Sequence, residues 1–284
     1  MTNKGIKDIQ KITSENYLPS KTLMYLQLKD YEKKVSYDDD THVYYYQNRT
    51  LSPTTSTISK FFPKFDSKGI SENLAKKELG SQLAANFDYV LKTAKKIRKK
   101  WSEKADLGTI VHRYGEFVLN SGQVPFKDIK SLKSMKSYAN LGKHTLSNYL
   151  KSIDKFLKDQ PQVLQNFLYS ELIVWNRKFS IAGQVDFITY NFADDSIDLW
   201  DWKTSKTITD ENVCFNSYGF GALSKLPATN FYKYTLQLSI YKQILELAGF
   251  KVNGLKILHL KEKDYKIIDV PYLSDEARYI LQNN

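Results

Sequence analysis

The sequence predicts an α/β fold, with a central mixed β-sheet flanked by helices and an N-terminal extension that is mostly helical. Residues 67–117 and 145–158 repeat apolar side chains at helical spacing. Residues 167–204 and 254–270 hold short runs of branched and aromatic residues, separated by a strong helical pattern at 230–247. We expect residues 105–284 to form one large core, with residues 1–104 packed on it as a strand and a basic helical region.

The N-terminal elements follow from short local patterns. We expect a helix around residues 21–29, a strand at 41–47, and a short helix at 57–62 after the turn and cap residues of 52–56. Residues 67–107 are helical and strongly basic, and the run includes Lys92, Lys95, Lys96, Arg98, Lys99 and Lys100. Such a run is either a solvated helix face or a surface that follows phosphates, because non-specific binding to nucleic acid needs only clustered cations.

The remaining elements follow in order. Residues 107–117 continue the helix, and a polar loop at 122–127 comes before a helix at 145–158 that ends at Asp159, Gln160 and Pro161. We expect strands at 167–175, 183–190 and 196–204, then an irregular stretch at 205–229. After the helix at 230–247 come strands at 254–260 and 265–270 and a terminal helix from residue 274.

Charge and composition limit the class of protein. The net charge of +11 and the pI near 9.3 favour a polyanionic partner, with nucleic acid ahead of an anionic membrane surface. No stretch approaches the roughly 18 apolar residues of a membrane span, and Met1–Gln10 lacks the apolar core of a secretory signal. The single Cys214 excludes an intrachain disulfide and a cysteine-based metal site, so we expect a cytoplasmic protein.

The hairpin formed by the strands at 183–190 and 196–204 carries the main candidate site. If Tyr190 pairs with Ile197, Asp186 faces Asp201 across the two strands, with their Cβ atoms roughly 4.5–5.5 Å apart. Lys203 then lies on the same face as Asp201, because side chains alternate along a strand. Two carboxylates at this distance repel unless a cation lies between them. The pattern predicts a divalent metal site beside an ammonium group; the alternative is a solvated hairpin with ordinary surface charge.

Other positions could serve the site, and each also has an ordinary interpretation. His112 lies one helical turn after Gly108, and the missing side chain there would let other backbone or a ligand approach the helix face that carries the imidazole. A lone histidine on an amphipathic helix is nevertheless more often a core residue than a ligand. Glu171 interrupts an apolar strand, so it must be paired, exposed or part of a site. Gln237 and Tyr241 share one face of a helix, as helix-surface residues beside a core stripe also do.

Taken together, these residues resemble a known family. The order Gly108-Thr-x-x-His112, Glu171, Gly183-x-x-Asp186, Asp201-Trp-Lys203-Thr204 and Gln237-x-x-x-Tyr241 resembles the PD-(D/E)XK nuclease superfamily. Within it, the chain is similar to the RecB-like exonuclease branch, including stand-alone phage-type and mitochondrial genome maintenance exonucleases. The resemblance covers roughly residues 105–270 and implies a restriction-endonuclease-like core. Asp-x-Lys alone is common by chance, whereas the combination of motifs is specific.

The resemblance also implies roles for individual residues. His112, Asp186 and Asp201 would bind Mg²⁺ or Mn²⁺ with the backbone carbonyl of Trp202. Lys203 would position and help deprotonate the attacking water and stabilise negative charge on the phosphate. The other residues that the resemblance places in catalysis are Glu171, Gln237 and Tyr241. The residues that it places against DNA are Arg113, Lys95, Lys96, Arg98, Lys99 and Lys100.

The sequence departs from the family in three places. Several relatives bind an iron–sulfur cluster through four cysteines, and this chain has one, so no such cluster is expected. A nucleotide-binding Gly-x-x-x-x-Gly-Lys loop is absent, so we expect no bound nucleotide and no helicase activity in this chain. Val185 stands where the superfamily name has proline, a common substitution in the RecB-like branch.

The expected function is a metal-dependent DNA exonuclease that acts on single-stranded ends in a bacterial or phage-infected cell, in DNA repair or recombination. A helicase or recombination protein could be its partner. One alternative is a structure-specific or restriction-like endonuclease. Another, from a different class, is an inactive nucleic-acid-binding or interaction protein on a nuclease fold, because fold does not fix function.

Overall fold

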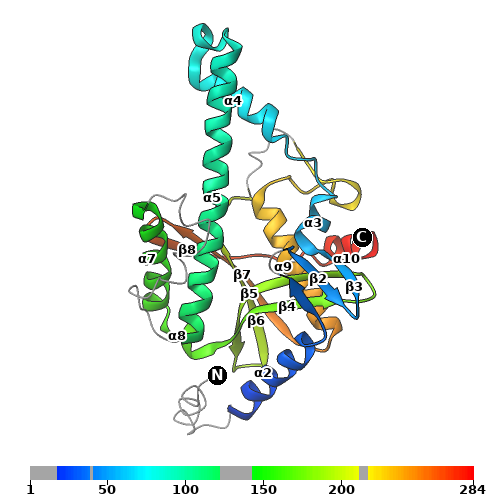
Figure 1. The fold of residues 1–284 in the computed structure, drawn as a ribbon. Helices are drawn as coiled ribbons and strands as arrows, with labels where there is room; N and C mark the ends of the chain where they lie inside the picture. Colours follow the sequence, from blue (N-terminus) through cyan, green and yellow to red (C-terminus); the bar gives the residue numbers. More distant parts are fainter. Residues whose placement is uncertain (1–17, 39–40, 122–142, 211–216) are drawn as a thin grey trace.

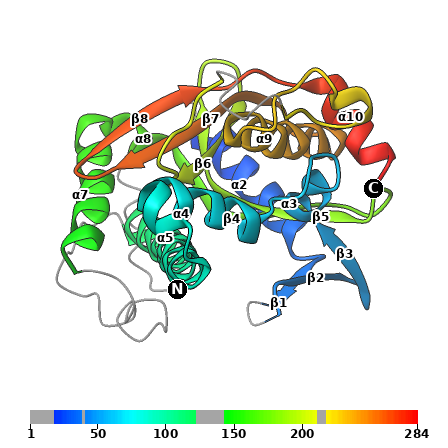
Figure 2. The ribbon, with the colours of Figure 1, turned by 90° about the horizontal axis from the view of Figure 1, so that it is seen from above.

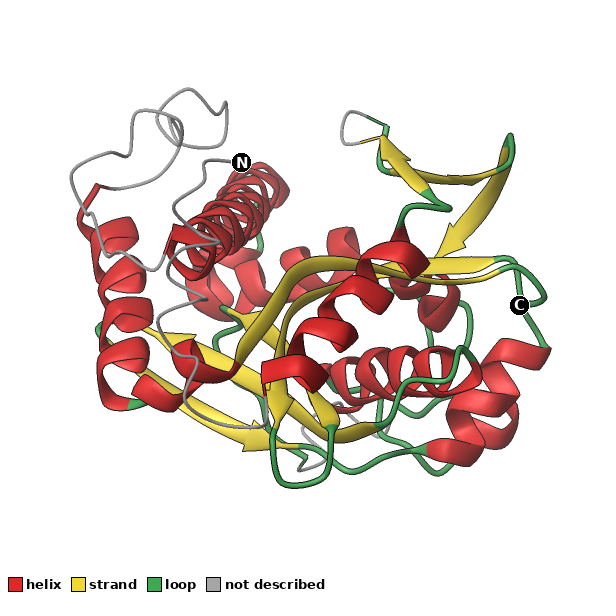
Figure 3. Ribbon diagram, turned by 90° about the horizontal axis from the view of Figure 1, so that it is seen from below, coloured by secondary structure: helices red, strands yellow, loops and turns green. Residues whose placement is uncertain are grey.

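A computed structural model describes residues 18–38, 41–121, 143–210 and 217–284 of the chain. The architecture is α/β, with a mixed central sheet between two groups of helices (Figures 1 and 3). This confirms the predicted fold class at the level of a mixed sheet flanked by helices. The loop expected at 122–127 and Cys214 lie outside the described residues.

The main sheet is built from the C-terminal half of the chain. Its strands are β4 (Phe167–Asn176), β5 (Ile181–Asn191), β6 (Ser196–Lys203), β7 (Val252–Lys261) and β8 (Asp264–Asp269). An antiparallel extension adds β1 (Ser36–Asp38), β2 (Val43–Tyr46) and β3 (Arg49–Pro53). The order is β1-β2-β3-β5-β6-β7-β8, and β4 also pairs with β5. The pairs β3–β5 and β6–β7 are parallel and the others are antiparallel, so the sheet is mixed.

Strand β5 changes partner along one of its edges. Ile181 and Ala182 pair with β3 in parallel, whereas residues 187–191 pair with β6 in antiparallel. On its other edge β5 pairs with β4 along most of its length. Residues 183–186 therefore lie between two different neighbouring strands. This interval contains Gly183 and Asp186.

Helices cover both faces of the sheet (Figure 2). One face packs against α5 (Phe87–Ser121), α7 (Lys143–Asp159) and α8 (Pro161–Asn166), with Phe187, Trp200, Trp202 and Leu258 in the shared core. The other face packs against α9 (Asn230–Leu247), α10 (Ser274–Gln282), α2 (Leu18–Glu32) and α3 (Thr54–Ser59). No described helix combines the length and apolar character that crossing a membrane requires.

A helical hairpin projects from this core (Figure 1). It consists of α4 (Ser67–Ala84) and the first half of α5, which meet through Ala75, Val90 and Ala94. At 1.5 Å per residue, the 35 residues of α5 extend about 52 Å. The boundary predicted at 104/105 falls inside this continuous helix. One helix therefore carries both the basic run and His112.

Several predicted elements were placed wrongly. The turn and cap residues of 52–56 are instead the end of β3 and the start of α3, because Ser52 N donates to Ser180 O at 2.8 Å in a parallel pairing that local sequence does not reveal. The helical pattern of 67–107 is two helices, since Asn86 accepts from Asp88 N and starts α5 anew. Pro161 begins α8 at its first turn rather than only ending α7.

The other predicted elements are confirmed within a few residues. They are the helices at 21–29, 145–158, 230–247 and from 274, the strand at 41–47, and the five strands of the main sheet. Helices α7 and α10 have one apolar face each, whereas α9, β5 and β6 are buried on nearly all sides and follow from continuous apolar runs instead.

Candidate active site

The hairpin of β5 and β6 has the predicted register up to the candidate aspartates. Tyr190 pairs with Ile197 and the ladder continues to Phe187 and Trp200. The ladder stops there, one position before Asp186 and Asp201. Beyond this point the Asp186 side chain connects the two strands, since its Oδ2 accepts a hydrogen bond from Trp202 N at 2.6 Å. Both aspartates are nearly inaccessible, with side chains 7% and 2% exposed.

Glu171 lies across from Asp186 on the other edge of β5. Its neighbours Ser170 and Leu172 pair with Phe187 and Val185 in one register, but Glu171 itself has a φ of +53°. A non-glycine residue in this left-handed region is strained and persists only where the surroundings hold it. Gln184 provides one such contact by donating from Nε2 to Glu171 O at 3.2 Å.

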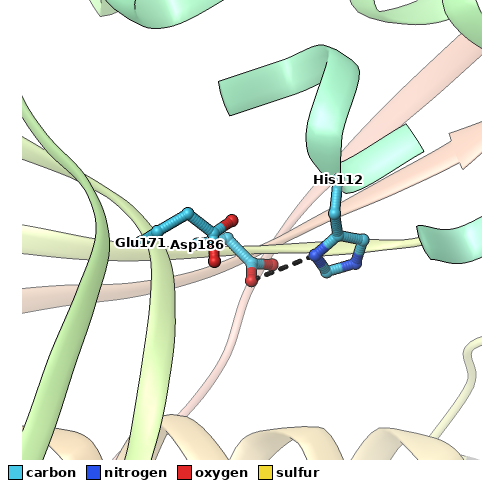
Figure 4. Close-up of side chains that lie close together, drawn as sticks. All are labelled: His112, Glu171 and Asp186. Atoms are coloured by element: carbon cyan, nitrogen blue, oxygen red, sulfur yellow. Dashed lines mark ion pairs between the residues drawn. The ribbon is translucent and has the colours of Figure 1, made fainter. Parts of the chain in front are cut away.

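His112 completes a group of three possible ligands. His112 Nδ1 lies 3.2 Å from Asp186 Oδ1, and one ligand atom from each of His112, Glu171 and Asp186 lies within 4.8 Å of the others (Figure 4). One imidazole and two carboxylates form a donor set that suits Mn²⁺ and also Mg²⁺. The His112 side chain remains 32% exposed, so the group is accessible from solvent.

The pKa values of all three residues in this group are shifted from their usual values. Burial and the neighbouring Asp186 carboxylate raise the pKa of Glu171 to about 8. Burial alone would lower the pKa of His112, but contact with Asp186 outweighs it and raises that pKa. Burial would also raise the pKa of Asp186, yet His112, Lys203 and the Trp202 N–H together lower it. At neutral pH the group therefore retains protons that a bound cation would displace.

Asp201 is not part of this group of three. Its Oδ2 lies 2.5 Å from Lys203 Nζ, and its Oδ1 accepts from Gln237 Nε2 at 3.2 Å. Burial raises the pKa of Asp201 to about 6, although Lys203 opposes the shift. Burial would lower the pKa of Lys203, but the Asp201 and Asp186 carboxylates outweigh burial and raise it. Lys203 is therefore an ammonium, with its side chain 16% exposed.

Gln237 and Tyr241 face the sheet from α9. Gln237 Nε2 contacts both Asp201 and the Tyr241 hydroxyl, the latter at 3.3 Å. The ring of Tyr241 lies over Gly183, where an added Cβ would come within 2.4 Å of the hydroxyl and 2.8 Å of Thr54 Oγ1. A side chain at this position would therefore force Tyr241 and Thr54 to shift. Gln237 thus reaches the site through Asp201, and Tyr241 contacts Gln237.

Helix α5 is held against β6 by a second glycine. A Cβ at Gly115 would lie 2.9 Å from two ring carbons of Trp202. We expected Gly108 to provide the close approach, but a Cβ there would meet only Thr204 Oγ1 at an ordinary 3.6 Å. Gly115 thus brings α5 close enough to place His112 beside Asp186. The sequence signal for this role was present, since Gly115 lies three residues after His112.

The predicted DNA-contacting residues lie along α5. Arg113 is next to His112 and contacts Glu116 at 3.6 Å. Arg98 NH1 donates to Ser71 Oγ on α4, so it ties the helical hairpin together. The exposed cations Lys95, Lys96, Lys99 and Lys100 lie on the projecting half of α5, on a side about 100–240° around the helix from His112. They are about 18–26 Å from His112 along the axis, too far to contact the same phosphate.

The helical hairpin nevertheless carries much of the positive charge. Residues 67–104 contain ten Lys and Arg and four Asp and Glu, a net charge of +6 out of the total of +11. A projecting, basic element that is continuous with the helix of His112 suits contact with a polyanion at a distance from the site.

One residue near the site was missed at the level of sequence. Tyr234 on α9 lies one turn before Gln237, and its ring is 4.8 Å from Lys203 Nζ. Its position three residues before Gln237 was the available signal, because residues i and i+3 share a helix face.

No protein-family model matches this chain, and no curated protein shows significant similarity to it. The function must therefore be inferred from the geometry and chemistry of the site.

Proposed function

We propose that the chain is a Mg²⁺- or Mn²⁺-dependent deoxyribonuclease of the PD-(D/E)XK type that acts as an exonuclease on single-stranded ends. The observation that carries the proposal is the group of His112, Glu171 and Asp186, within 4.8 Å of one another and beside the Lys203–Asp201 pair. The mixed sheet with helices on both faces is compatible with the restriction-endonuclease-like core that the resemblance implies.

The group would hold the metal ion, and the scissile phosphate would lie beside it. When bound, Mg²⁺ or Mn²⁺ supplies Lewis acidity toward a phosphate oxygen and the attacking water. His112, Glu171 and Asp186 would hold the cation, with Glu171 and His112 giving up protons as it binds. Asp186 keeps its orientation through the Trp202 N–H.

Lys203 stabilises the transition state as a cation. The Asp201 and Asp186 carboxylates keep its proton on, so it donates to the oxygens on which negative charge grows. This favours the electrostatic role over deprotonation of the water. Asp201 orients the ammonium, and Gln237 fixes Asp201 from α9.

The substrate class follows from charge. The projecting α4–α5 hairpin, with a net charge of +6, would hold phosphates several nucleotides away from the cleaved bond. Binding through backbone phosphates carries no sequence information, which suits an enzyme that degrades a strand progressively.

The test is digestion of single-stranded oligonucleotides carrying either a 5′ or a 3′ label, with Mg²⁺, with Mn²⁺ and with chelator. We expect metal-dependent shortening from an end, and no cleavage of a covalently closed single-stranded circle. Cleavage of the circle would assign the site to an endonuclease instead. If neither metal supports cleavage while DNA is still bound, the chain is a binding protein on a nuclease fold.

A further inference from the structure

Tyr234 lies on the face of α9 that points to the site. Tyr234, Gln237 and Tyr241 occupy positions i, i+3 and i+7, so they form one row along the helix. Gln237 contacts Asp201, and the Tyr234 ring lies 4.8 Å from Lys203 Nζ. The two halves of the Lys203–Asp201 pair are therefore each contacted by a different residue of this row.

The Tyr234 hydroxyl also contacts the segment that directly follows β6. It lies 2.7 Å from Ser205 Oγ, two residues beyond Lys203. The Ser205 carbonyl lies 2.6 Å from Nε2 of His259 on β7, and His259 pairs with Lys203 across the parallel strands. The end of β6 is thus held from α9 and from β7.

We propose that Tyr234 is a positioning residue that holds the Lys203 ammonium where it meets the scissile phosphate. Lysine has a flexible four-carbon stem, and Asp201 restrains only one side of its ammonium. The aromatic ring restrains a second side, since a cation is attracted to the face of a tyrosine ring within about 6 Å. The inference rests on the proposed nuclease function and assigns to that site a residue outside the family motifs.

The two contacts of Tyr234 can be separated by substitution. Tyr234→Phe keeps the ring and removes only the Ser205 contact, whereas Tyr234→Leu removes both. Tyr234→Met is a second non-aromatic variant in case the branched side chain prevents folding. Tyr232→Leu, two residues away on α9, removes a tyrosine that contacts Phe231 and serves as the matched control.

In cleavage assays with Mn²⁺ we expect kcat to fall about tenfold in Tyr234→Leu, the size of one cation–π contact. KM and the Mn²⁺-induced rise in melting temperature should change less than about twofold, since the proposed role of the ring is to hold the Lys203 ammonium and not to bind the metal ion. Tyr234→Phe should stay within about threefold of wild type. A kcat for Tyr234→Leu equal to that of the Tyr232→Leu control, or an equal loss in Tyr234→Phe and Tyr234→Leu, would overturn the proposal.

A second measurement does not depend on catalysis. Acetylation of Lys203 by acetic anhydride at one fixed pH, followed by mass spectrometry with exposed Lys261 as the internal reference, reports how firmly the ammonium is held. Several-fold faster labelling in Tyr234→Leu, with wild-type labelling in Tyr234→Phe, supports positioning by the ring. Unchanged labelling in Tyr234→Leu contradicts it. A wild-type protein that cleaves nothing but shows this labelling pattern would reject the nuclease function and retain the contact.

Discussion

Glu171 makes a specific prediction about pH. Its pKa is raised from 4.5 to about 8 in the metal-free protein, so below pH 8 the carboxyl carries a proton that a cation must displace. Each pH unit below 8 then lowers metal affinity up to about tenfold, and between pH 8 and pH 6 Glu171 alone should weaken Mn²⁺ binding about 50-fold. His112, whose pKa is also raised, steepens the dependence further.

Raising the pH strengthens metal binding, but it lowers the stability of the metal-free protein. A pKa that is raised on folding stabilises the fold below pH 4.5, and this stabilisation is lost as the pH rises through about 8. Added Mn²⁺ should therefore raise the melting temperature more at pH 8 than at pH 6.

Calorimetric titration with Mn²⁺ at pH 6, 7 and 8, in buffers of different ionisation enthalpy, measures both the affinity and the protons released. Glu171→Gln keeps the shape of the side chain but cannot ionise, so its affinity should be weaker at pH 8 and much less dependent on pH. Glu246→Gln, at a carboxylate that is 38% exposed and pairs with Lys242, is the control and should behave as wild type. A wild-type affinity that is equal at pH 6 and pH 8 would refute the assignment of Glu171 to the cation.

Three further predictions concern the lysine, the packing beneath Tyr241 and the helical hairpin. Lys203→Met should lower kcat by about a thousandfold or more while Mn²⁺ binding measured by calorimetry persists, and a small loss would contradict its role at the phosphate. Gly183→Ala should destabilise the fold by about 1–3 kcal/mol in denaturant unfolding, since its Cβ would clash with Tyr241 and Thr54; unchanged stability would show that both can move aside. Replacing Lys95, Lys96, Lys99 and Lys100 by glutamine should weaken binding to single-stranded DNA and reduce the salt dependence by about 0.7 per lost phosphate contact, whereas four surface lysines elsewhere should not.

The hairpin that carries Asp186, Asp201 and Lys203 could be predicted from sequence because its determinants are local. A short polar loop and alternating side chains fix the register of an antiparallel pair. The ladder ends one position before the aspartates for a reason that is not local. There β5 leaves β6 and pairs with β3, a strand formed more than a hundred residues earlier.

The least predictable features depend on contacts distant in sequence. The left-handed backbone of Glu171 leaves no mark in its neighbours, which continue in register on both sides. The position of His112 on its helix favours an ordinary core histidine, and only the combination with the other motifs suggests a metal ligand. Tyr234 was missed because its partner Lys203 lies on another element, and because aromatic residues are abundant in this chain.

The most direct test of the account is cleavage of end-labelled single-stranded DNA by wild type and Asp186→Asn over one Mn²⁺ titration. Asp186 links the three ligands to β6 through Trp202, and asparagine preserves its size while removing the charge. We predict that wild-type cleavage rises and saturates with Mn²⁺. Asp186→Asn, still folded and still bound to DNA, should cleave at least a thousandfold more slowly or not at all, which corresponds to about 4 kcal/mol in the barrier. Wild-type protein that leaves the strand intact at saturating Mn²⁺, or an Asp186→Asn variant that cleaves at the wild-type rate, would contradict it.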